Sequence, residues 1–195
     1  MKNRIAASAA TVLALAAVNV MAAPGDIIGG GNIEFTGKVS ADTCYVLNKG
    51  GDAKTILVNM GNVNTADLVN STVTSPALPQ GVDAGSASFD ITCSAATGVV
   101  MKFAAPASQL VTGNKILKIN NGSTGPSLAG GVGIAVYKDR SSTDAFDLSN
   151  GELYSGTLAA GQKERVGFAA AYVKTTGDLK AGDANATLPF TIITP

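Results

Sequence analysis

The chain has 195 residues, enough for one domain of ordinary size, and its 14 Lys and Arg residues balance 14 Asp and Glu residues. That balance argues against nucleic acid as a partner, because binding to phosphates requires a surplus of basic side chains. The sequence contains no His and only two Cys. Ser-His-Asp and Cys-His catalysis, His-based zinc sites and a thiolate-only metal cage are therefore excluded.

The first 22 residues have the pattern of a secretory signal peptide. Lys2 and Arg4 form a positive start, an apolar run extends over residues 5–20, and small residues around Ala22 suit a cleavage site. A membrane anchor is the alternative, but the run is short for a span of about 20 residues and a Gly-rich segment follows it. We therefore expect an exported chain that begins after residue 22.

The predicted export bears on whether the two cysteines form a disulfide. Cys44 and Cys93 are the only pair, and an oxidising compartment would join them. The alternative is two free buried thiols, or one thiol that is reactive. We predict a structural disulfide.

Beyond the signal peptide the sequence predicts strands. Short runs alternate between apolar and polar residues, and clusters of Gly, Asn, Asp, Ser and Pro separate them. A single helical turn is predicted at residues 65–69, and no longer helical period occurs. In chain order, the predicted strands cover residues 33–39, 55–60, 88–93, 99–103, 115–119, 132–137, 164–173 and 186–194. This spacing favours an all-β sandwich of immunoglobulin-like architecture, with a closed barrel as the alternative.

The two ends of the body suit pairing between chains better than a closed domain. Residues 23–41 are rich in glycine around one alternating segment, and the sequence stops almost where the last predicted strand ends. A spare strand at one end and an open edge at the other suggest completion by strand addition.

Several stretches resemble the major-type subunits of chaperone–usher fimbriae, the type 1 pilin family. The run at residues 30–39 precedes Cys44 as the family's aromatic-x-Gly-x-Val run precedes its first cysteine, and residues 89–93 resemble the strand with the second. Residues 131–137 resemble its Gly-Val strand. Its closing signature is matched by residues 158–161, 168–172 and 181–186.

The resemblance implies a structural, non-enzymatic subunit of a surface fimbria, without catalytic residues, metal or cofactor. Its fold would be an incomplete immunoglobulin-like β-sandwich completed by a donor strand from a neighbouring subunit. The implied division is a signal peptide at 1–22, a donor-strand extension at 23–41 and a pilin body at 42–195. The donor residues carried over are Gly31, Ile33, Phe35, Gly37 and Val39.

The resemblance also implies the partners. A periplasmic pilus chaperone would deliver the subunit to an outer-membrane usher, and the polymer would contain copies of this chain, with minor pilins and a tip adhesin. The chaperone-contacting C-terminal strand would present Phe190, Ile192 and Thr194. The pattern departs from the family here, because Thr194 occupies the place of the usual penultimate Tyr and Pro195 adds no N–H donor.

Other readings are weaker. The cluster from Gly25 to Gly31 lacks the Lys-Ser or Lys-Thr of a phosphate-binding loop, and Asp139, Asp144 and Asp147 lack the alternating oxygens and central Gly of a calcium loop. A minor tip or adaptor pilin is the alternative within the family. A secreted β-sandwich lectin that binds glycans is the alternative outside it, although the chain has no Trp for stacking on sugars.

Overall fold

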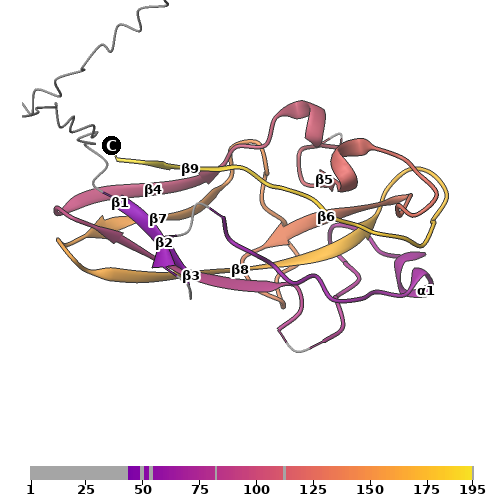
Figure 1. The fold of residues 1–195 in the computed structure, drawn as a ribbon, viewed down its shortest axis with the longest axis horizontal. Coiled ribbons are helices and arrows are strands. Elements are labelled where there is room, and N and C mark those ends of the chain that lie inside the picture. Colours follow the sequence, from indigo (N-terminus) through magenta and orange to yellow (C-terminus); the bar gives the residue numbers. More distant parts are fainter. Residues whose placement is uncertain (1–43, 49–50, 53–54, 82, 112, 195) are drawn as a thin grey trace, which may run out of the picture. The chain divides into compact units, whose positions relative to one another are not determined.

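The structure is a computed structural model that describes residues 44–48, 51–52, 55–81, 83–111 and 113–194, all within the compact unit Ala41–Pro195. The predicted signal peptide, the predicted strand at residues 33–39 and all five predicted donor residues lie outside the described residues. Figure 1 shows the elements in order. They are β1 (Cys44–Asn48), β2 (Gly51–Asp52), α1 (Thr65–Leu68), β3 (Ser86–Cys93), β4 (Thr97–Phe103), η1 (Ala107–Gln109), β5 (Leu117–Lys118), η2 (Ile119–Gly122), β6 (Val132–Tyr137), β7 (Glu152–Leu158), β8 (Lys163–Lys174) and β9 (Phe190–Ile193).

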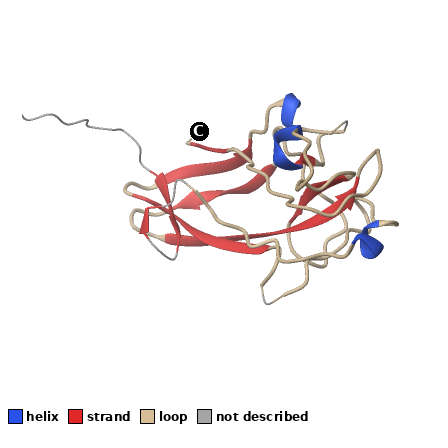
Figure 2. Cartoon of the chain, turned by 45° about the vertical axis from the view of Figure 1, so that its right-hand side comes forward, coloured by secondary structure: helices blue, strands red, loops and turns tan. Residues whose placement is uncertain are grey.

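The strands form two antiparallel sheets, and the helices are single turns on loops (Figure 2). The large sheet has the order β2-β1-β3-β8-β6-β5, and the small sheet has the order β7-β4-β9. This confirms the mostly β fold predicted from the sequence. Each sheet, in the described part of the chain, has two open edges rather than the continuous ladder of a closed barrel.

The centre of the large sheet is β8, which pairs with β3 along one part of its length and with β6 along the other. Phe89 lies opposite Val166, and Ile134 lies opposite Tyr172. β8 is long because its 12 residues serve both partners in succession. Its apolar and β-branched side chains suit a strand that is paired on both edges.

The hydrophobic core lies between the two sheets. At one end, Ile91 of β3 packs in the same cluster as Met101 of β4 and Leu158 of β7. At the other end, Phe103 of β4 packs with Val136 of β6 and with Leu148, which precedes β7. Both clusters draw side chains from both sheets, so burial of these faces holds the sheets together.

β6 is buried along its whole length because both of its faces are covered. Ile134 and Val136 face the core between the sheets, while Ala135 and Tyr137 join a separate cluster with Val173. The Tyr137 hydroxyl donates a hydrogen bond of 2.7 Å to the carbonyl of Val73, so the buried polar group is satisfied. A strand that is covered on both faces has a nearly continuous run of apolar residues. Such a run predicted the strand at residues 132–137.

The predictions for the buried strands are confirmed, and those for the less regular segments are not. β3, β4, β6, β8 and the helical turn α1 lie where the sequence placed them. The predicted strand at 115–119 shrinks to the two residues of β5, and Ile119 already begins η2, in which Asn120 and Asn121 adopt left-handed backbone conformations. The predicted strand at 186–194 begins only at Phe190.

One strand prediction is wrong, and three strands were not predicted. Residues 55–60 are extended but belong to no described strand, because no described backbone pairs with residues 55–58. β1, β2 and β7 were not predicted. β7 has a mixed pattern of half-buried and exposed residues, with Ser155 and Gly156 in its centre, and such a pattern gives little periodic signal.

Candidate functional site

A large apolar groove lies along β9, between β1, residues 55–65 and the segment at residues 180–189. We call it the β9 groove; its volume is about 1350 Å³. Its floor is the hydrophobic core itself, because side chains of both sheets line it. Those floor residues include Met101, Phe103, Ile134, Val136, Phe168 and Tyr172.

One wall of the groove is formed by the extended residues 55–60. Ile56, Val58 and Met60 are half-buried, and the residues between them are exposed, so the segment alternates as a strand does. Leu57, which faces outward, is 81% exposed. Within the described chain, the first backbone hydrogen bond along this segment is at Asn59, whose carbonyl accepts from Gly85 N at 2.7 Å. The segment thus has the side-chain pattern of a strand, and residues 55–58 have no backbone partner among the described residues.

The opposite wall is β9. Phe190 and Ile192 are half-buried and line the groove, while Thr191 and Ile193 point outward. β9 pairs with β4, and no described strand pairs with its other edge. Thr194 follows the end of β9, is exposed and lies outside the lining of the groove. Two of the three residues predicted to form a C-terminal binding strand therefore share one face, and the third does not.

The floor of the groove is apolar and, among the described residues, carries no charged side chain. The charged lining residues of the groove, among those described, are Lys180 and Asp183 on the rim. The polar group at the floor is the hydroxyl of Tyr172, which donates to the carbonyl of Ala184 at 3.3 Å. Burial raises the pKa of Tyr172, so its hydroxyl stays neutral. Such a floor favours apolar side chains over charged ones.

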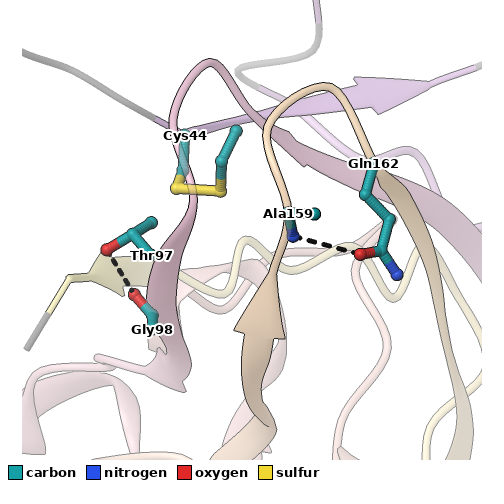
Figure 3. Close-up of a disulfide and its surroundings, with 6 residues drawn as sticks. Cys44, Thr97, Gly98, Ala159 and Gln162 are labelled. Carbon is teal, nitrogen blue, oxygen red and sulfur yellow. Dashed lines mark hydrogen bonds between the residues drawn. A yellow bond between two sulfur atoms is a disulfide. The ribbon is translucent and has the colours of Figure 1, made fainter.

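The predicted disulfide is confirmed. Cys44 and Cys93 lie directly opposite each other on β1 and β3, with Cα atoms 4.0 Å apart. Figure 3 shows the bond beside the turn between β7 and β8, where Gln162 Oε1 accepts a hydrogen bond of 3.0 Å from Ala159 N. The backbone of Gly161 in the same turn donates to the carbonyl of Cys93 at 2.8 Å. The disulfide therefore fixes the first described strand to the centre of the large sheet.

Comparison with protein families decides the class of the molecule. The family model described as "Fimbrial protein" matches residues 33–194, which is most of the chain. The chain belongs to the fimbrial protein family. No curated protein matches it. The family is structural and non-enzymatic, so this fimbrial protein is a subunit of a surface fimbria, and subunits of this kind assemble into pili.

Among the described residues of this fimbrial protein, no group of three or more His, Cys, Asp or Glu side chains could hold a metal ion, and no helix has the length and apolar character needed to cross a membrane. The three aspartates considered for calcium have separate partners. Asp139 accepts hydrogen bonds from Ser141, and Asp147 accepts them from Ser149; these bonds lower the pKa of both carboxyl groups. Asp144 pairs with Lys115 at 2.7 Å. The aspartates stabilise turns rather than gather around one point.

Sequence reasoning did not assign the groove lining at residues 180–189 or the residues that anchor it. Leu188 packs on the core and Asp183 forms a bridge with Leu128, so this loop is part of the site. The sequence did contain a sign of this loop. The run at residues 181–186 contributed to the family resemblance, but it was given no structural role. Its contacts join segments far apart in the sequence, and no local pattern reveals them.

Proposed function

We propose that this fimbrial subunit polymerises by donor-strand exchange, with residues 23–41 of one copy inserted into the β9 groove of the next. The observation that carries the proposal is the groove itself: an apolar channel that reaches the core and is bordered by residues 55–58 and by one edge of β9, neither of which pairs with any described backbone. In this proposal the described body is an immunoglobulin-like sandwich that lacks one strand.

The size of the groove suits a peptide strand. Its volume of about 1350 Å³ exceeds the roughly 300–1,000 Å³ that is usual for small-molecule pockets. A strand laid between β9 and residues 55–60 would form main-chain hydrogen bonds on both sides, which is the usual mode of strand addition. Alternate side chains of that strand would face the apolar floor.

The donor segment has the matching chemistry. Ile33, Phe35 and Val39 fall on one face of an alternating segment, together with Gly31 and Gly37. Each large apolar side chain that is fully buried contributes about 1.5–3 kcal/mol. Gly37 would let the incoming strand pass a shallow part of the floor, as the family resemblance implies. Copies of one chain can therefore supply both the groove and its occupant.

The disulfide supports a mechanical role. The proposed extension ends just before Cys44, and the bond to Cys93 ties that point to the centre of the large sheet. Tension along a fibre would enter each body through the chain just before Cys44. The covalent bond would carry this load past β1, whose own hydrogen bonds are few.

The pathway before assembly is part of the same proposal. A signal peptide at residues 1–22 would direct export through the periplasm, where a pilus chaperone would occupy the groove beside Phe190 and Ile192 until delivery to an outer-membrane usher. An exposed apolar groove needs such cover, because open sheet edges promote aggregation. Minor pilins and a tip adhesin would complete the fimbria.

The test is electrophoresis in SDS of material sheared from producing cells, with and without boiling. Wild type should give a ladder of multimers that collapses to one band on boiling. Phe35→Ala and Gly37→Asn should lose the ladder while keeping the disulfide-bonded body. The matched control is Thr36→Ala, on the opposite face of the segment, which should keep it. A soluble monomer in both lanes, for wild type, would instead favour a closed lectin-like domain.

A further inference from the structure

One asparagine from another part of the fold makes three hydrogen bonds to one rim of the β9 groove. The rim is the segment at residues 180–189, which leads into β9 (Figure 1). Asn120 lies in η2, far from this rim in the sequence. Its side-chain Nδ2 donates to the carbonyl of Asp183 at 2.7 Å, and its Oδ1 accepts from Asn185 N at 3.3 Å. Its backbone N–H donates to the carbonyl of Asn185 at 2.6 Å.

The backbone of Asn120 explains why an asparagine can do this. Its φ is 52° and its ψ is 29°, in the left-handed region that Gly and Asn tolerate best. That conformation turns η2 so that backbone and side chain point to the same stretch of rim. Both polar backbone groups of Asn185 are thereby paired with one residue.

The bonds from Asn120, which we call the Asn120 clip, matter because of where they lie along the rim. Asp183 has further partners, since its N–H donates to Ser127 O at 2.9 Å and its carbonyl accepts from Ala129 N at 3.0 Å. Asn185 has its backbone bonds, among the described residues, to Asn120 alone. The next backbone bond along the rim is at Pro189, whose carbonyl accepts from Ala104 N at 2.9 Å. Residues 186–188 span the gap between these two anchors.

We propose that Asn120 is a positioning residue for strand uptake, which holds the rim before β9 in the conformation that an incoming strand requires. This rests on the proposed function of the groove. A rim that is already ordered loses less conformational entropy when a strand binds, so uptake is faster and tighter. Without the bonds from Asn120, the rim between Ala184, which the Tyr172 hydroxyl still bonds, and Leu188, which still packs on the core, must be ordered at the moment of binding.

The neighbouring residue supplies a matched control. Asn121 has φ 52° and ψ 30°, almost the same backbone conformation, is exposed and has no side-chain hydrogen bond in the described structure. Asn120→Gly and Asn121→Gly therefore make the same chemical change in the same conformation. Glycine accepts a positive φ without strain, so neither change should prevent folding.

The experiment uses the full secreted chain, dissociated in guanidinium and refolded with its disulfide intact. The probe is a fluorescent peptide with the sequence of residues 31–39, and the rate of its uptake is measured by anisotropy. We expect Asn120→Gly to slow uptake about tenfold, equivalent to about 1.4 kcal/mol, and Asn121→Gly to leave it within about twofold. The unfolding midpoints of the two strand-free variants should remain close to each other.

The outcomes separate the two proposals. If wild type takes up no peptide, the proposed function of the groove is wrong. If wild type takes it up and Asn120→Gly does so equally fast, or if both glycine variants slow it equally, the role of Asn120 is wrong. Should Asn120→Gly fail to fold, Asn120→Asp replaces it, because it keeps Oδ1 but loses the Nδ2 donor. Uptake by that variant at the wild-type rate would also overturn the role.

Discussion

The centre of the large sheet and the rims of the β9 groove satisfy their backbone groups in different ways. β8 pairs with β3 and β6, and the Ile91 and Val173 side chains in this region are fully buried. β9 pairs on one edge, and residues 55–58 have the alternation of a strand without a described partner. The first region is complete within one chain. The second has the geometry of a sheet that another strand can complete.

The comparison explains where sequence reasoning succeeded. β3, β6 and β8 were placed almost to the residue, because burial between or beneath other elements gives a strong apolar pattern. The alternation at residues 55–60 is present in the burial of their side chains, but the strand predicted from it is not, because alternation records only which face a side chain occupies. It does not record whether the backbone has a partner.

The groove could not be predicted from local sequence pattern, because its parts come from segments far apart in the sequence. Its floor combines Phe103 of β4 with Ile134 of β6, and its rim depends on Asn120, far from the loop that it holds. Asn120 and Asn121 follow the predicted strand at 115–119, and their left-handed conformations lie in η2, after β5 has ended at Lys118. The contact with Asn185 follows from tertiary structure alone.

The largest expected effect comes from removing the disulfide that joins β1 to β3. Replacing both Cys44 and Cys93 by Ser removes a bond between residues 49 apart in the sequence. On the chain-entropy model this lowers the free energy of unfolding by about 4 kcal/mol. Urea unfolding of the refolded, strand-free subunit measures it. A midpoint unchanged from wild type would show that β1 needs no covalent anchor.

Two alanine substitutions compare the regions directly. Ile91→Ala, at a fully buried site on β3, should cost about 2–5 kcal/mol in the strand-free subunit. Ile192→Ala on β9 should cost the strand-free subunit less, since that side chain is only half-buried. The same change should weaken fibres more than strand-free subunits, as judged by the temperature at which the SDS-resistant ladder disappears. Equal losses in both states would contradict a groove that gains its burial on assembly.

Alkaline pH should lower the stability of the folded chain, because Tyr137 of β6 is buried in the large sheet. Burial raises the pKa of Tyr137 to about 12, while an unfolded tyrosine ionises near 10. The folded state therefore holds the proton more tightly, so stability is intact below about pH 10 and falls as pH rises from there toward 12. Tyr137→Phe should lose about 1 kcal/mol at neutral pH, because its bond to Val73 is gone, and should lose less than wild type between pH 8 and 11. Urea midpoints that fall equally in both proteins over this range would contradict this assignment.

The smallest effect is expected at the surface of the large sheet. Arg165 pairs with Asp90 at 2.8 Å, and its hydrogen bond lowers the pKa of that carboxyl group. Because the Arg165 side chain is 74% exposed, Arg165→Gln should leave the urea midpoint at pH 7 almost unchanged. A lowered pKa contributes stability that is lost in acid, so wild type should lose slightly more than the variant below about pH 4. A large loss at pH 7 would mean that the pair matters more than its exposure implies.

Amide hydrogen exchange on assembled fibres and on refolded, strand-free subunits tests the central claim most directly. The account predicts that amides of β6 and β8 are protected in both samples. Amides of residues 55–58, and those β9 amides that do not face β4, should be protected in fibres only, because an inserted strand would bond to them. Equal exchange at these amides in both samples would contradict insertion of a strand into the β9 groove.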